Sequence, residues 1–252
     1  MALYSDKRLR HLKVHEDLDK ALKIPDKVVR LRLWQVEDAA QIARIAELPR
    51  LQSLSISRSD VSLLVPKLTE LKDLQILDLQ SCGVSEFPRN LLDLRHLRYL
   101  SMGNNGLTEV PEDLDRLELL EDLKFLQNGL TRIPECVYRL ARLTVLGFSH
   151  NAIETVAEEI GELRKLEWLF LDYNRIGAMP QSMGNLVRLR GLALRKNQLR
   201  ALPTSIGQLS QLVYLSLEDN PLESLPSCLG KMPQIASLNL EPEKRGLFMD
   251  HR

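Results

Sequence analysis

This chain has few of the side chains that carry disulfide or redox chemistry. Of its 252 residues only three are cysteines, Cys82, Cys136 and Cys228. An odd and sparse set of this kind does not make a disulfide framework, so we expect a reducing compartment. None of the motifs C-x-x-C, HExxH, GxGxxG and GxxxxGK[ST] occurs. The sequence therefore predicts no cofactor, no catalytic residues and no enzymatic activity.

Histidine offers no strong metal site. His11 and His15 lie four residues apart and would share one face of a helix. Two such ligands without a third make a poor zinc site. We expect no bound metal.

Excess charge of one sign and long apolar runs are also missing. The chain has 34 basic and 34 acidic residues, a formal net charge of +0, which argues against a nucleic-acid partner. No run of 18 apolar residues occurs, so we expect no membrane insertion. The start, MALYSDKRLRHLKVHEDL, lacks the apolar core of a secretory signal. Together these features favour a cytoplasmic protein.

The chain does contain an internal repeat of 23 residues. The repeat 166–188 begins LEWLFLDYN, and the same frame holds without insertion or deletion from residue 51 to residue 234. Residues 28–50 fit the frame loosely, and a partial repeat begins at Ile235, which gives nine full repeats and a final strand. The first half of each repeat reads L-x-x-L-x-L-x-x-N-x-L, and the second half reads L-P-x-x-I-x-x-L.

These two motifs resemble those of the leucine-rich repeat superfamily, in the class with 23-residue LP-type repeats. Within it the chain is similar to small bacterial and Ras-group-related intracellular leucine-rich repeat proteins. The resemblance implies an α/β solenoid coiled as a curved horseshoe. It would have a parallel β-sheet on its concave side and short helical or 3-10 turns on its convex side. It also implies a role as a scaffold or adaptor, for example in signalling.

The repeat frame also predicts which side chains are buried. Positions 4 and 6 of each repeat are apolar and alternate with positions 3, 5 and 7, which should face outward. Asparagine at position 9 should form a buried ladder, which the early repeats lack because Val36, Ser59 and Cys82 stand there. That end should be less regular. We assign residues 1–27 to an N-terminal cap, 28–241 to the repeats and 242–252 to a C-terminal cap or tail.

The outward positions 3, 5 and 7 identify candidate binding residues. Trp168 and Phe170 occupy two of them, although only 5% of the chain is aromatic. Gly191, Ala193 and other small neighbours should leave both rings standing clear for a partner. An aromatic centre with a charged rim is typical of protein interfaces. The candidate partner-binding residues are Trp168, Phe170, Tyr214, Asp172, Arg195, Tyr99, Leu126 and Trp34.

The main functional hypothesis is a non-enzymatic module that binds a protein partner on its concave face, with a monomer favoured. One alternative is a bacterial effector that recognises a host protein. Another is a self-associating structural protein, and a third is a binder of small molecules or glycans. The rings could also pack over their small neighbours and simply fill the sheet surface.

Overall fold

The computed structural model describes residues 3–240, apart from the side chains of Asp6 and Lys7. The chain divides into two compact parts, residues 1–128 and 129–252. We call them the first part and the second part, and each is described by itself.

The described residues of the first part form six strands, which pair in parallel and in chain order. The pairing keeps equivalent repeat positions side by side, as in Arg30↔Ser53 and Ser53↔Ile76. The strands are β1 (Val14–His15), β2 (Arg30–Trp34), β3 (Ser53–Ser57), β4 (Ile76–Gln80), β5 (Tyr99–Ser101) and β6 (Asp122–Lys124).

The described residues of the second part form five strands with the same parallel register. Each has three residues. They are β7 (Val145–Gly147), β8 (Trp168–Phe170), β9 (Gly191–Ala193), β10 (Tyr214–Ser216) and β11 (Ser237–Asn239).

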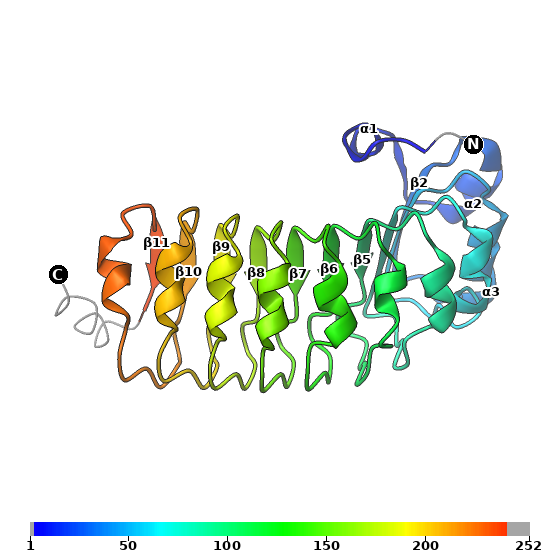
Figure 1. The fold of residues 1–252 in the computed structure, drawn as a ribbon. Helices are drawn as coiled ribbons and strands as arrows, with labels where there is room; N and C mark the ends of the chain where they lie inside the picture. The colour runs from blue at the N-terminus through cyan, green and yellow to red at the C-terminus, as the bar shows by residue number, and fades with distance from the viewer. Residues whose placement is uncertain (1–2, 241–252) are drawn as a thin grey trace. The chain divides into compact units, whose positions relative to one another are not determined.

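Apart from α1 (Asp6–Arg10), short helical turns cover the side of each sheet opposite the outward-facing residues (Figure 1). The first part has α1 (Asp6–Arg10), α2 (Leu18–Leu22), α3 (Ala39–Ala43), η1 (Pro25–Lys27), η2 (Arg44–Glu47), η3 (Val65–Glu70), η4 (Arg89–Asp93) and η5 (Leu114–Arg116). The second part has η6 (Glu135–Arg139), η7 (Glu158–Glu162), η8 (Gln181–Asn185), η9 (Thr204–Gln208) and η10 (Ser227–Lys231).

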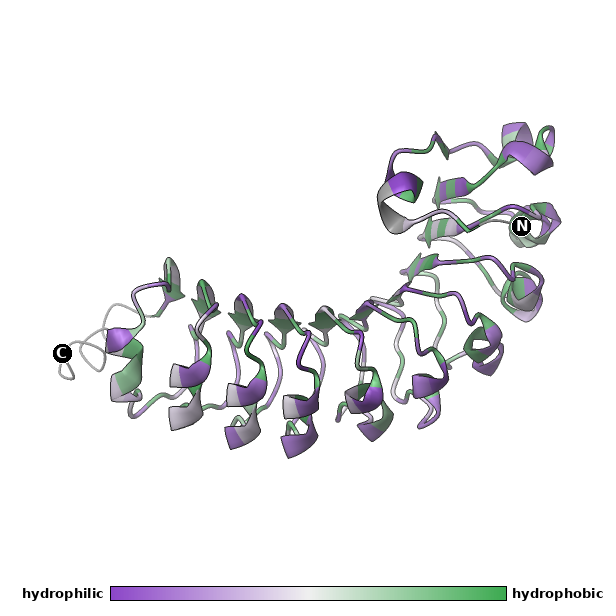
Figure 2. Ribbon diagram, turned by 45° about the horizontal axis from the view of Figure 1, so that its top comes forward, coloured by the Kyte–Doolittle hydropathy of each residue, from purple (hydrophilic) through white to green (hydrophobic). Residues whose placement is uncertain are grey.

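The sheet and the turns enclose a core that runs through each part. In β8 and the residue after it, Leu169 and Leu171 at positions 4 and 6 are both 0% exposed. Proline fixes φ and comes directly before several turns, for example Pro180 before η8 and Pro203 before η9. Figure 2 shows hydrophobic residues along the strands and polar residues on the outer side of the turns. The predicted α/β arrangement, parallel strands opposite short 3-10 turns, is confirmed.

The position-9 asparagines hold neighbouring coils together; four of them, Asn105, Asn174, Asn197 and Asn220, are buried, while Asn128 and Asn151 are half-buried. Asn174 donates from Nδ2 to the carbonyl oxygens of Phe148 (3.0 Å) and Leu171 (2.9 Å). Its Oδ1 accepts a hydrogen bond from the backbone N–H of Ile153 at 2.9 Å. These bonds satisfy backbone groups that make no sheet hydrogen bonds.

The coils that lack this asparagine are not less regular, contrary to expectation. Strands β2, β3 and β4 each have five residues, two more than the later strands. Shorter side chains take over the bonding there. Ser59 Oγ accepts from the Val36 N–H at 2.9 Å, and the Cys82 thiol donates to the Ile56 carbonyl oxygen at 3.4 Å.

One residue in every coil adopts a left-handed backbone conformation. Nine residues other than glycine have φ between 51° and 59°, and they are spaced 23 residues apart, just before position 9. Only Asn104 and Asp219 are of the types that enter this region readily. The conformation recurs because the strand must turn inward there, and the residue types at this position do not predict it. The residues are Gln35, Arg58, Ser81, Asn104, Gln127, His150, Tyr173, Lys196 and Asp219.

The two ends of the chain differ in how far they are described. The N-terminal segment contains α1, β1 and α2, and β1 pairs with β2 through Val14 and Arg30. Its role as a cap stays a prediction. The assignment of 242–252 to a cap or tail lies outside the described residues. Among residues 3–240, no helix combines the length and the apolar character that crossing a bilayer requires.

Candidate functional site

Two aromatic rings lie side by side on the outward face of β8 in the second part. The Trp168 and Phe170 rings are stacked, with centroids 5.9 Å apart and planes 10° apart. Both side chains are half-buried. Trp168 lies directly over Gly191 of β9, where an added Cβ would come within 2.1 Å of the ring.

The expectation that these rings stand clear of their small neighbours is therefore wrong. Gly191 and Ala193 are in register with Trp168 and Phe170, and both small residues are buried. The absence of a side chain at Gly191 lets the indole lie flat on the sheet, which favours dispersion contact over exposure. The result is a low aromatic surface whose two rings remain partly exposed to solvent.

Tyr214 extends this surface across the sheet. It lies on β10 in register with Gly191, so one strand separates it from Trp168. Tyr214 is half-buried, and Ser216 two residues later is 3% exposed. We call Trp168, Phe170 and Tyr214 the aromatic surface.

Asp172 and Arg195, the two charged candidates beside the aromatic surface, already bond to other residues of the protein. Asp172 Oδ1 accepts a hydrogen bond from the Arg195 backbone N–H at 2.7 Å, so this carboxylate fixes the next coil. Burial raises the pKa of Asp172. The Arg195 guanidinium lies 3.0 Å from Asp219 Oδ2 and 3.8 Å from Glu218 Oε2. The charge of Arg195 is thus partly neutralised by its neighbours.

The structure adds a stack at the edge of the second part that was not predicted. The His150 and Tyr173 rings lie parallel, with centroids 4.0 Å apart. The Lys196 ammonium lies 4.8 Å from the Tyr173 ring centroid, a cation–π distance. All three residues occupy the left-handed position of successive coils, and this spacing of 23 was the signal in the sequence.

The remaining three candidates belong to the first part. Trp34 is 61% exposed, and the Arg58 guanidinium lies 5.7 Å from its ring. Tyr99 is half-buried, and its ring lies 5.0 Å from the Lys124 ammonium. Burial raises the pKa of the Tyr99 phenol to about 12. Leu126 is half-buried.

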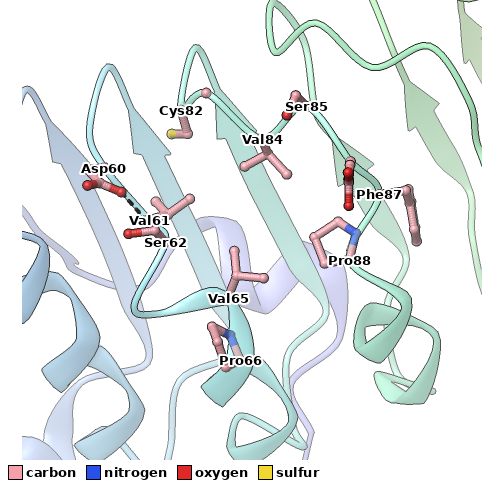
Figure 3. A pocket seen from close by; sticks show the side chains of 12 residues that line it. Asp60, Val61, Ser62, Val65, Pro66, Cys82, Val84, Ser85, Phe87 and Pro88 are labelled. Carbon is pink, nitrogen blue, oxygen red and sulfur yellow. Dashed lines mark hydrogen bonds between the residues drawn. The ribbon is translucent and has the colours of Figure 1, made fainter.

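A hollow of about 340 Å³ lies off the sheet face, between the segments that follow β3 and β4 (Figure 3). Val61, Val65 and Phe87 give it an apolar wall, and Cys82 lies at one side. The Cys82 thiol is 8% exposed, and burial raises its pKa to about 11. A protonated thiol is a weak nucleophile, so Cys82 is poorly suited to covalent catalysis.

This thiol should resist modification in the folded protein. At pH 8 a thiol with a pKa of about 11 remains protonated, so Cys82 should react with a thiol reagent only after unfolding. Cys136 is buried and should behave alike, whereas the half-exposed Cys228 is the control that reacts first. Counting modified thiols by mass spectrometry, with and without urea, checks this. Modification of Cys82 ahead of Cys228 in the native protein would contradict it.

Within the described residues no group of three or more His, Cys, Asp or Glu side chains could hold a metal ion. His11 and His15 do not share a helix face, because His11 caps the C-terminus of α1 and His15 lies in β1.

Comparison with known proteins supports the fold. The family model described as "Leucine-rich repeat region" matches residues 50–169 and 154–247. No curated protein sequence matches the chain at a significant level.

Several solved structures resemble this one. A leucine-rich repeat protein of Leptospira interrogans is 29% identical, with a TM-score of 0.83 over 90% of this chain and 58% of that protein. The ectodomain of the Arabidopsis thaliana receptor kinase GASSHO1/SCHENGEN3, solved with Casparian strip integrity factor 2, is 25% identical. Its TM-score is 0.73 over 84% of this chain and 29% of that one. This chain thus spans well under two thirds of either protein.

An internalin of Listeria monocytogenes has a TM-score of 0.70 at 22% identity, over 88% of this chain and 70% of that one. At this identity the similarity concerns the fold alone.

Proposed function

Because the chain belongs to the leucine-rich repeat family, we propose that it is a non-enzymatic module that binds a protein partner on the sheet side of its repeats. The observation that carries this proposal is the aromatic surface of the second part. Trp168 and Phe170 are stacked 5.9 Å apart on an outward face, where the positions between and after them, Leu169 and Leu171, already fill the core. Clustered aromatic side chains on a rigid surface are typical of binding hot spots.

The rigidity of this surface supports binding. The strands are fixed by parallel hydrogen bonds, and Asp172 ties its coil to the next through the Arg195 N–H. Little conformational freedom is left to lose when a partner docks. The plant receptor kinase GASSHO1/SCHENGEN3, which is 25% identical, was solved in complex with Casparian strip integrity factor 2. It lends the proposal support by analogy only.

The proposal places the protein in a reducing compartment, as a cytoplasmic scaffold. Cys82, Cys136 and Cys228 are free thiols. Extracellular repeat proteins of small size generally use cysteines in disulfides.

Replacing both aromatic residues by alanine tests the proposal. The double variant Trp168→Ala, Phe170→Ala should lose at least 30-fold in affinity for a protein captured from native lysate, because a hot-spot pair contributes about 2 kcal/mol or more. Val187→Ala, in an exposed residue on a turn of the same part, is the matched control and should bind normally. Circular dichroism checks that both variants fold. Equal capture by the wild type and the double variant would sink the proposed surface.

A further inference from the structure

The N-terminal segment Leu3–Lys13, which we call the strap, lies against the sheet of the first part. Figures 1 and 2 place α1 on the side of the strands away from the turns. The Tyr4 backbone N–H donates to Gln52 Oε1 at 2.9 Å, and Gln75 Nε2 donates to the Tyr4 carbonyl oxygen at 3.0 Å. These contacts join residues 48 and 71 positions apart in the sequence.

The side-chain amides of Gln52 and Gln75 form a preformed binding site for a peptide main chain. They occupy the same position of successive repeats, directly before β3 and β4, and are 1% and 2% exposed. Gln75 Nε2 also donates to Gln52 Oε1 at 2.8 Å, which orients both amides. Buried amides need hydrogen-bond partners, and here the Tyr4 main chain supplies one donor and one acceptor.

The other end of the strap is held in the same way. Arg30 Nη1 of β2 donates to the carbonyl oxygens of Arg10 (2.7 Å) and Leu12 (3.1 Å). Between the two attachments Leu9 is 1% exposed, although it belongs to a helix of only five residues. The strap is thus fixed by main-chain hydrogen bonds and one apolar anchor.

Two carboxylates on this sheet complement a basic occupant. Asp78 of β4 and Asp122 of β6 each have a buried Oδ1 that no hydrogen bond reaches within the described residues. Their Oδ2 atoms bond to Ser55 (3.4 Å) and Lys124 (2.8 Å). Burial raises the pKa of Asp122, while the charges of Lys124 and Arg10 oppose that rise. Arg10 therefore lies close enough to Asp122 to interact with it electrostatically.

We propose that the strap is an internal occupant of a peptide-binding face, and that the partner is a basic peptide segment whose leucine and arginine replace Leu9 and Arg10 on that face. The strap is itself such a segment, with four basic side chains and one acidic. Gln52, Gln75 and Arg30 bind main-chain atoms and would accept many sequences. Selectivity comes from the site of Leu9 and from Asp122.

The strap also regulates access to this face. As part of the same chain it has a high effective concentration, so a free peptide competes at a disadvantage. Loosening the strap should therefore raise the apparent affinity for a peptide in trans. This site lies in the first part and does not depend on the aromatic surface.

The full-length protein and a fluorescent peptide of sequence LYSDKRLRHLK test the proposal by anisotropy. Leu9→Ser in the protein removes the apolar anchor of the strap and should tighten peptide binding at least tenfold over wild type. Arg10→Ala, in an exposed side chain that cannot endanger the fold, should tighten it about threefold. Adding Asp122→Asn to Leu9→Ser should weaken binding at least tenfold. Trp168→Ala, Phe170→Ala is the matched control and should leave peptide binding unchanged.

Three results would overturn the proposal. Equal peptide binding by wild type, Leu9→Ser and Arg10→Ala would leave the strap no role as competitor. A control peptide with Leu9→Ser and Arg10→Glu could bind as tightly, which would remove the stated selectivity. If the Leu9→Ser protein formed dimers in light scattering and did not bind the peptide, the occupant of this face would be a second copy of the chain.

Discussion

Replacing Asn197 by alanine should lower the free energy of unfolding by about 3–4 kcal/mol, because several buried backbone groups lose their partner at once. Asn197 is 6% exposed. Its Nδ2 donates to the carbonyl oxygens of Leu171 and Leu194, each at 3.0 Å, and to that of Arg195 at 3.3 Å. Its Oδ1 accepts from the Ile176 N–H at 3.0 Å.

Urea unfolding followed by circular dichroism measures this loss. Gln198→Ala changes the neighbouring exposed side chain and is the matched control, expected to stay within about 0.5 kcal/mol of wild type. If the two variants unfolded at the same urea concentration, the asparagine ladder would contribute little and the apolar core alone would hold the coils.

Gly191→Ala should displace the Trp168 ring and remove the aromatic surface without touching either ring chemically. The new Cβ would come within 2.1 Å of one ring carbon and 2.2 Å of the next. A rigid indole cannot bend away, so it must leave the sheet or the strands must shift. Overpacking of this kind costs about 1–3 kcal/mol. Partner binding should fall as far as it does for the double ring variant.

Fluorescence reports the displacement directly. In a Trp34→Phe background Trp168 is the only tryptophan, and its emission should shift to longer wavelength when the ring enters water. Gly177→Ala is the control, because an added Cβ there meets nothing within 4 Å. Unchanged emission in Gly191→Ala would mean that the sheet absorbs the methyl group and that the ring is not held as described.

The repeat frame made most of the fold predictable. Apolar residues at positions 4 and 6 and asparagine at position 9 recur every 23 residues, and one burial pattern repeated nine times leaves little freedom. The strap was not predictable, because Gln52 and Gln75 look like ordinary exposed residues beside a strand. Their role depends on Tyr4, which lies outside the repeat and is brought back by the fold.

The candidate site was predictable in its location but not in its packing. The outward positions identified Trp168 and Phe170, and both lie on the sheet surface. Whether a ring projects from the sheet or lies on it depends on the size of the residue beside it on the next strand. Here Gly191 on the next strand offers a flat platform. The repeat position of an aromatic residue does not predict whether its ring projects from the sheet or lies on it, because both arrangements have the same spacing in the sequence.

The asparagine ladder gives the chain a direction of assembly. Asn174, Asn197 and Asn220 each donate a hydrogen bond back to the coil before their own. A coil that has just left the ribosome is therefore incomplete until the next one arrives to bond its turn. In the last described turn the Leu222 N–H bonds instead to the nearby Asn220 carbonyl oxygen, at 2.8 Å. Since each coil needs only a successor of the same kind, whole repeats can be added or lost during evolution while the junctions remain intact.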